Sequence, residues 1–291
     1  MFTGAMVALI TPFQDGEIDR RTLDELIDFQ LENAIDGIVP VGTTGESPTL
    51  SHQEHKKLIE RVVKAVGGQV PVIVGAGSNS TAEAIDLTAF AKKVGADATL
   101  QVCPYYNKPA QEGFYQHFKA IAEEVDLPIV LYNIPGRCGG QGLTAQTVAR
   151  LAEIENIVAI KEASGKLDMA SAIATSCDIT IVSGDDSLTL PIASVGGKGV
   201  ISVVANIVPA DVKAMTDLIL EGDFTSALKW HKKLFALCKN LLGLATNPIP
   251  IKAAMAMLNM ASEEMRLPMT PMDESKKEIL KQTLRSYGLL N

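Results

Sequence analysis

Short apolar runs recur along the first two thirds of the chain and alternate with longer amphipathic segments. Eight runs are present, at intervals of about 20 to 34 residues, the length of a β-strand with its following helix. Short runs without polar alternation are typical of buried parallel strands. The sequence therefore predicts strands over residues 6–10, 38–41, 72–74, 98–102, 129–131, 157–160, 179–182 and 199–204.

The segments between these runs carry apolar residues at helical spacing. They predict helices over residues 23–31, 55–65, 82–94, 114–124, 145–151 and 169–174. Helix-start signals support three of them. Asp19 or Thr22 precedes the first helix, Ser51 precedes the second, and Ser80 with Glu83 has the capping-box form before the third.

Eight parallel strands with short crossover helices favour a (β/α)₈ barrel, which we assign to residues 1–208. The alternative is an open doubly wound sheet, but no G-x-G-x-x-G motif follows any predicted strand. From about residue 209 the pattern predicts helices without strands between them, over 210–220, 224–242, 251–258 and 274–287. We therefore expect residues 209–291 to form a small all-helical C-terminal region packed on the barrel.

Functional residues of such a barrel lie at the carboxyl ends of its strands. Lys161 closes the predicted strand 157–160. A lysine there can bury its stem while its amine faces a cavity, and loss of hydration lowers the pKa of the ammonium. The free amine can then form a Schiff base with a ketone or aldehyde. The alternative is an ordinary lysine that reaches water.

Other strand ends carry groups that suit the same chemistry. Thr43 and Thr44 lie in Gly42-Thr43-Thr44-Gly45-Glu46 after the second strand, a loop that can hold a carboxylate or form a simple turn. Tyr106 and Tyr132 follow the fourth and fifth strands and can relay protons. Arg137, five residues after Tyr132, has the forked guanidinium that binds carboxylates.

Composition narrows the function classes. The 291 residues carry a net charge of −8, so nothing indicates nucleic-acid or anionic membrane binding. The four cysteines are widely spaced without a metal-ligand pattern, and no apolar run approaches the length of a membrane span. We expect a soluble, cytoplasmic protein with reduced cysteines and no metal.

Several of these segments together resemble the dihydrodipicolinate synthase family of pyruvate-dependent class I aldolases, over essentially the whole chain. The segments that carry the resemblance are Met1-Phe2-Thr3-Gly4, Val41-Gly-Thr-Thr-Gly-Glu-Ser47, Pro104-Tyr-Tyr-Asn107, Tyr132-Asn-Ile-Pro-Gly-Arg137, Ile160-Lys-Glu-Ala163, Ser183-Gly-Asp-Asp186 and Asn247-Pro-Ile-Pro-Ile-Lys252. Their combination at these separations is highly specific for the superfamily, and Arg137 narrows it further.

The resemblance implies an enzyme that condenses pyruvate with L-aspartate 4-semialdehyde, in the first committed step of lysine and diaminopimelate synthesis. Lys161 would form the imine with pyruvate, and no metal or organic cofactor is implied. Tyr132, Thr43 and Tyr106 match the proton relay, with Tyr106 entering the site of a neighbouring subunit in a homotetramer built as a dimer of dimers. Substrate-binding positions are matched by Thr44, Arg137, Gly184 and Ile201.

A second site is implied at a subunit interface, where members of the family bind L-lysine as a feedback inhibitor. Six residues match it: Ser47, His52, His55, Asn79, Glu83 and Tyr105. Glu83 could pair with an ammonium group, and Tyr105 and Asn79 could hold a carboxylate.

Two other functions remain open from the sequence. One is a related aldolase acting on a 2-keto-3-deoxy sugar acid, for which Arg137 would matter less. The other is a non-catalytic keto-acid-binding protein, which would have no use for a proton relay formed by Tyr132, Thr43 and Tyr106.

Overall fold

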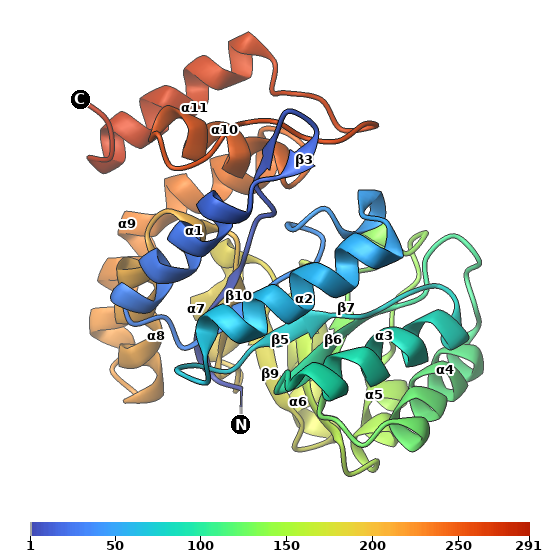
Figure 1. Ribbon diagram of the computed structural model, residues 1–291. Coiled ribbons are helices and arrows are strands. Elements are labelled where there is room, and N and C mark those ends of the chain that lie inside the picture. The colour runs from blue at the N-terminus through green and yellow to red at the C-terminus, as the bar shows by residue number, and fades with distance from the viewer. Residues whose placement is uncertain (1) are drawn as a thin grey trace.

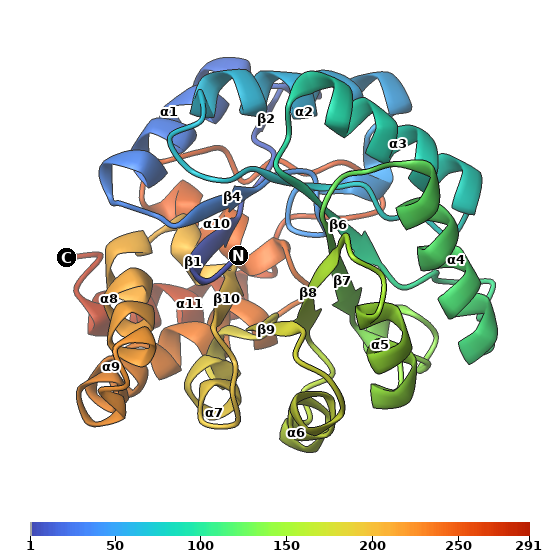
Figure 2. The same ribbon diagram turned by 90° about the horizontal axis from the view of Figure 1, so that it is seen from below.

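The computed structural model describes residues 2–291, and its centre is an eight-stranded parallel sheet ringed by helices (Figure 1, Figure 2). The strand order is β4-β1-β10-β9-β8-β7-β6-β5, and a bridge between Ile38 and Val72 joins the two ends into a barrel. The predicted (β/α)₈ barrel is confirmed. Its strands are β1 (Gly4–Ala8), β4 (Gly37–Val39), β5 (Ile73–Gly75), β6 (Ala98–Val102), β7 (Ile129–Asn133), β8 (Ile157–Glu162), β9 (Thr180–Ser183) and β10 (Gly199–Ser202).

Helices follow the strands and cover the outside of the barrel (Figure 2). They are α1 (Arg20–Glu32), α2 (His52–Val66), α3 (Thr81–Val94), α4 (Gln111–Glu124), α5 (Ala145–Ala152), α6 (Leu167–Ser176), α7 (Thr189–Ala193) and α8 (Pro209–Leu220). Three short β-strands and α-helices were not predicted. The hairpin of β2 (Phe13–Gln14) and β3 (Glu17–Ile18), and the five-residue α7, are too short to show a periodic pattern.

The three helix-start signals are confirmed, although the capping box predicted for the third helix is incomplete. Asp19 caps α1, and Ser51 forms a full capping box with Glu54 at the start of α2. At α3, Ser80 accepts from the backbone of Glu83, but the Glu83 carboxylate turns away to His52 and Ser78. The predicted capping box of α3 is therefore only half formed.

Strands β7 and β8 are longer than their apolar runs predict, because each continues through a polar pair. Tyr132 and Lys161 are cross-strand partners and lie within the strands instead of after them. The next residues point to the opposite face, where Asn133 donates to the Glu162 carboxylate at 2.7 Å. The alternation thus points Tyr132 and Lys161 into the barrel, while Asn133 and Glu162 are buried on the opposite face of the sheet.

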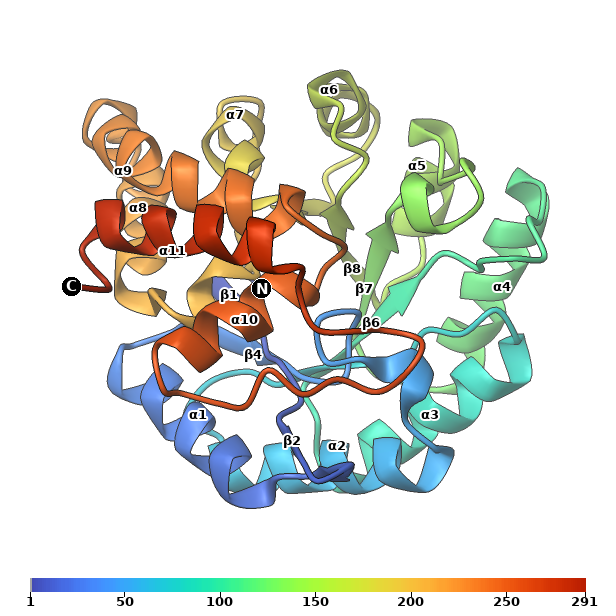
Figure 3. The ribbon, with the colours of Figure 1, turned by 90° about the horizontal axis from the view of Figure 1, so that it is seen from above.

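The C-terminal region continues with α9 (Phe224–Gly243), α10 (Ile249–Met257) and α11 (Glu274–Tyr287). Figure 3 shows α10, α11 and the segment between them arching over one end of the barrel. The expected boundary at residue 208 falls just before α8, yet α8 packs against β1 and β10 as the eighth barrel helix. We therefore propose that the barrel extends to Leu220. Among residues 2–291, none of the helices combines the length and apolar character needed to cross a bilayer.

Candidate active site

Lys161 extends from β8 into the interior of the barrel. Its side chain is buried, with the residue 6% exposed, and its Nζ lies 4.4 Å from the centre of the Tyr132 ring. Burial lowers the pKa of the Lys161 ammonium to about 8; the Asp186 carboxylate opposes this shift and Arg137 adds to it. At neutral pH about a tenth of the molecules therefore carry the free amine, against far less than a hundredth for an exposed lysine.

A cavity of about 230 Å³ opens above Lys161 at the carboxyl ends of the strands. We call it the barrel cavity. Among its lining residues are Lys161, Tyr132, Thr43, Thr44, Arg137 and Gly184, which come from the ends of four strands, β4, β7, β8 and β9, or the loops that follow them. The structure thus brings these six sequence-predicted residues together around one space.

Tyr132 and Thr43 stand side by side at this cavity. Burial raises the pKa of Tyr132 to about 12, although the positive charge of Arg137 and hydrogen bonding with Thr43 oppose the shift. The phenol therefore remains protonated at neutral pH. Its hydroxyl can donate to a reacting oxygen and recover a proton through Thr43.

Gly184 makes room for the side chain of Lys161. A Cβ placed on Gly184 would lie 3.0 Å from both Cγ and Cε of Lys161 and 2.7 Å from the Cβ of Ala163. Only glycine therefore fits beside the lysine stem. Ile201, in contrast, does not line the barrel cavity and packs with Tyr132 and Val182 in the barrel interior, where it can support the cavity from below.

Arg137 and Thr44 are joined by Asn247, a residue for which the sequence suggested no role. The Nη2 of Arg137 donates to the Asn247 carbonyl at 3.0 Å, and the Asn247 side-chain amide donates to Thr44 Oγ1 at 3.0 Å. Asn247 also lines the barrel cavity. The C-terminal region thus contributes one wall of the site and orients both groups.

Asp186 is the second residue without a predicted role. It is buried, and its carboxylate accepts from the Ser202 hydroxyl and, at 2.9 Å, from the Val203 amide. Burial raises the pKa of Asp186 to about 6, against the effect of these two hydrogen bonds. Asp186 is thus ionised above that pH and supplies negative charge near the Lys161 amine.

Tyr106 lies apart from the barrel cavity. Its side chain is 90% exposed, and its backbone is left-handed with φ of 68°, which is rare for an aromatic residue. Within one chain, Tyr106 therefore contacts neither Lys161 nor Tyr132.

A second cavity of about 360 Å³ lies beside the first, and we call it the side cavity. Five of the six residues of the implied lysine site line it: Ser47, His52, His55, Glu83 and Tyr105. His52 Nε2 lies 2.9 Å from the Glu83 carboxylate, which Ser78 also contacts. The Glu83 carboxylate at this cavity therefore already has two partners within the protein.

Two residues of the implied lysine site have other partners. Asn79 does not line the side cavity, and its amide donates to the Tyr105 carbonyl at 3.2 Å. His55 is buried against the Gly75 carbonyl at 2.7 Å, and burial lowers its pKa. Thr43 and Arg137 line both cavities, so the two spaces share walls.

No group of three or more histidine, cysteine, aspartate or glutamate side chains in residues 2–291 is arranged to hold an ion. The buried charged groups around Lys161 are instead satisfied by protein hydrogen bonds.

Comparisons with known proteins agree with this geometry. The model of the dihydrodipicolinate synthetase family matches residues 1–287. A protein of Pelobacter propionicus named 4-hydroxy-tetrahydrodipicolinate synthase is 51% identical over 292 residues, which cover 100% of both chains.

Two solved structures also match. The dihydrodipicolinate synthase of Acinetobacter baumannii, described as chloride-inhibited and complexed with pyruvate, is 41% identical with a TM-score of 0.97 and 100% of both chains covered. The enzyme of Cyanidioschyzon merolae with lysine bound is 43% identical with a TM-score of 0.95 and 99% of both chains covered. The family match and the identities over the full length, added to the barrel and its buried lysine, place the chain in the dihydrodipicolinate synthetase family of enzymes.

Proposed function

We propose that this enzyme condenses pyruvate with L-aspartate 4-semialdehyde to 4-hydroxy-tetrahydrodipicolinate, in lysine and diaminopimelate synthesis. One observation carries the proposal: a buried Lys161 amine of lowered pKa faces a cavity that Tyr132, Thr43, Thr44 and Arg137 also line. The names of the full-length relatives support the same reaction.

The reaction begins when the Lys161 amine attacks the ketone carbon of pyruvate to give a carbinolamine. Tyr132 protonates the departing hydroxyl, which leaves as water, and an imine forms. Loss of a methyl proton converts the imine to an enamine, whose carbon attacks the aldehyde of the second substrate. The amino group of that substrate then displaces Lys161 from the imine carbon, which closes the ring and frees the enzyme. The lysine itself is the electron sink, so these steps require no metal or organic cofactor.

The cavity walls can hold the two substrates in order. Thr44, fixed by Asn247, is placed to bind the pyruvate carboxylate beside Lys161, while Gly184 leaves space for the imine. Arg137 uses one N–H donor in its hydrogen bond to the Asn247 carbonyl. Its other donors can bind the carboxylate of the semialdehyde bidentately. Ile201 would close the pocket from below.

Tyr106 completes the relay from a neighbouring subunit in this proposal. Its 90% exposure and left-handed backbone support a role outside its own chain. The active unit would then be a dimer at least, and we propose a homotetramer formed by two such dimers. We also propose that the enzyme works in the cytoplasm, where pyruvate is available.

The side cavity is proposed to bind L-lysine as an inhibitor. The lysine complex of the Cyanidioschyzon merolae relative supports this proposal, together with the carboxylate of Glu83 and the aromatic ring of Tyr105. The ammonium of the ligand would compete with His52 for Glu83. Thr43 and Arg137, shared with the barrel cavity, would carry the effect toward the catalytic residues.

Turnover tests the substrate assignment. Purified enzyme with pyruvate and L-aspartate 4-semialdehyde should form product, and Arg137→Ala should lower kcat/KM for the semialdehyde by about 10- to 100-fold, the effect of losing charged hydrogen bonds. Arg150→Ala, which removes an exposed arginine of α5 paired with Glu112, is the control. Wild-type enzyme that ignores the semialdehyde but cleaves a 2-keto-3-deoxy sugar acid would assign it to that aldolase class.

The pH dependence of imine formation tests the Lys161 environment. Trapping of the pyruvate imine with borohydride should increase with pH around a midpoint near 8, because only the free amine attacks. Asp186→Asn removes a negative charge that raises the pKa of Lys161, so its midpoint should move to lower pH. Asp178→Asn, an exposed site, makes the same charge change and should leave the midpoint in place. A wild-type midpoint near 10.4, the value of an exposed lysine, would contradict the proposed environment.

Substitution of Gly184 tests the packing around the lysine stem. Gly184→Ala should displace Lys161 and slow imine formation by about tenfold or more, since small misplacements of a reacting group are costly. The same change at Gly136, where an added Cβ meets no atom within 4 Å, should have little effect. Equal imine rates in the two variants, measured by mass spectrometry after borohydride, would refute the crowding argument.

A lysine titration tests the side cavity. L-Lysine should inhibit turnover at about millimolar concentration or below, and Glu83→Gln should raise the inhibitory concentration by about tenfold, the effect of one lost ion pair of about 1.4 kcal/mol. Asp86→Asn, on the same helix but paired with Lys56, is the matched control. If calorimetry shows no binding and assays show no inhibition at millimolar lysine, the effector site is rejected.

A further inference from the structure

A buried ion pair next to the barrel cavity has no part in the chemistry described so far. Glu46 ends the loop after β4, and Lys252 lies in α10. Their side chains are 2% and 0% exposed, and the carboxylate contacts the ammonium directly. Lys252 also donates to the Glu264 carbonyl at 2.8 Å and lies 4.4 Å from the centre of the Phe13 ring. Two fully buried, mutually paired charges are costly to bury, which makes a specific role worth seeking.

Glu46 holds a backbone conformation that its sequence does not favour. Its φ is 55°, in the left-handed region, and Val41 at the other end of the same loop has φ of 50°. Non-glycine residues remain there only when the surroundings impose it. The Glu46 amide donates to the Thr43 carbonyl at 3.1 Å, so the position of Glu46 is coupled to that of Thr43.

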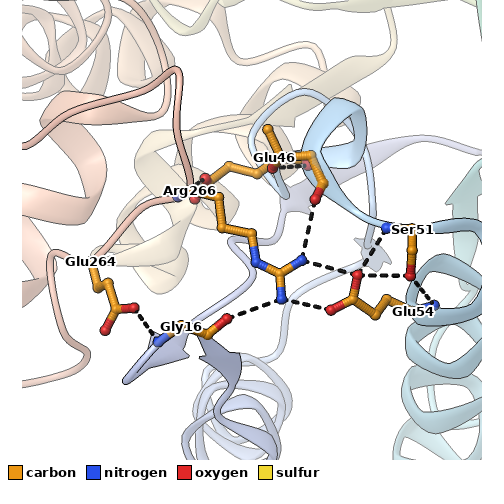
Figure 4. A network of polar contacts seen from close by, with 7 residues as sticks. Gly16, Glu46, Ser51, Glu54, Glu264 and Arg266 are labelled. Atoms are coloured by element: carbon orange, nitrogen blue, oxygen red, sulfur yellow. Dashed lines mark hydrogen bonds and ion pairs between the residues drawn. The ribbon is translucent and has the colours of Figure 1, made fainter.

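A second contact holds the same glutamate from the segment between α10 and α11. The Arg266 amide donates to the other Glu46 carboxylate oxygen at 3.2 Å. The Arg266 guanidinium binds Glu54 bidentately at 2.6 and 3.0 Å and donates to the Gly16 carbonyl at 3.1 Å. Figure 4 shows Arg266 between Glu54 and Gly16, with Glu46 above. The segment is thereby tied to the start of α2 and to the β2–β3 turn.

Residues at and just before the start of α10 contact the loop at two points. Asn247, which precedes the helix, donates to Thr44, and Lys252, within the helix, pairs with Glu46. Thr43 and Thr44 therefore lie in a short loop that residues of the C-terminal region hold at two places. The Thr11 hydroxyl anchors the same loop from within the barrel and donates to the Gly45 carbonyl at 2.7 Å.

We propose that Glu46 and Lys252 are a positioning pair, which holds the 41–46 loop so that Thr43 and Thr44 face Lys161. The pair touches neither substrate nor the reacting atoms and acts through the two threonines. The C-terminal region is then a working part of the active site as well as a cover over the barrel. The inference rests on the roles proposed for Thr43 and Thr44.

The test compares a charge-free variant with a matched control. Glu46→Gln with Lys252→Met removes both charges together, which avoids leaving one buried charge unpaired. Glu263→Gln with Lys277→Met removes an ion pair of the same region that does not touch the loop. Both proteins are compared with wild type for melting temperature, hydrogen exchange of the 43–47 amides, kcat, KM for pyruvate and the rate of imine trapping.

We expect the Glu46/Lys252 variant to fold and oligomerise like wild type, to exchange its 43–47 amides faster, and to lose about 10- to 100-fold in kcat and imine rate. The control should match wild type in all of these. If the double variant does not fold, Glu46→Gln alone gives the same comparison, because Lys252 can release its proton and remain buried.

Unchanged exchange at 43–47, or unchanged kcat and imine rate in a folded variant, overturns the proposal. Exchange that increases throughout the protein would show a structural role only, and would also overturn it. A wild-type enzyme that forms no imine with pyruvate would instead remove the proposed function, whereas the exchange comparison would still decide whether the pair fixes the loop.

Discussion

Loss of hydration at one amine is the constraint on which this active site depends. A lysine enclosed by apolar strands becomes more reactive only if burial destabilises its ammonium form, and the protein stays folded only if the free-energy cost of that burial is limited. At Lys161 the barrel interior destabilises the ammonium, and the negative charge of Asp186 limits the cost. Tyr132, Thr43 and Gly184 can then be understood as groups that use or accommodate this amine. Each would be an ordinary core or loop residue without it.

The chain buries a second lysine, and the contrast between the two explains their different uses. Lys252 is even less exposed than Lys161, and burial lowers its pKa as well. Its ammonium, however, contacts the Glu46 carboxylate directly and donates to a carbonyl, and Lys252 is not among the residues that line the barrel cavity. Burial alone therefore does not account for the nucleophilic role proposed for Lys161. That role also requires a neighbouring cavity and the absence of a direct counter-ion.

Most of the barrel and much of the candidate site could be predicted because their signals are local. Eight apolar runs, the Ser51 capping box and the strand-end position of Lys161 are all encoded within a few neighbouring residues. The extension of β7 and β8 through Tyr132 and Lys161 was missed, because polar residues that point inward near a strand end break the apolar run. The predicted boundary at residue 208 rests on the lack of strands after it. The contacts of α8 with β1, at the start of the chain, leave no trace in such a pattern.

The remaining parts of the site depend on contacts between distant residues. Asn247 is 203 residues from Thr44, and Arg266 is 212 residues from Glu54. No periodicity or spacing links such positions. Asp186 likewise acquires its environment from β10 and its following loop, through Ser202 and Val203. Sequence patterns can name the chemistry of a side chain, but its partners are set by the closure of the barrel.

The shared walls of the two cavities have a thermodynamic consequence. Thr43 and Arg137 face both spaces, so an occupant on one side that shifts either residue changes the free energy of binding on the other. Thermodynamic linkage makes this coupling symmetrical. If a bound effector lowers the affinity for substrate by some factor, bound substrate lowers the affinity for the effector by the same factor. Inhibition by the effector would then weaken as the substrate concentration rises. The coupling would pass directly through Thr43 and Arg137 and would need no long-range path through the protein.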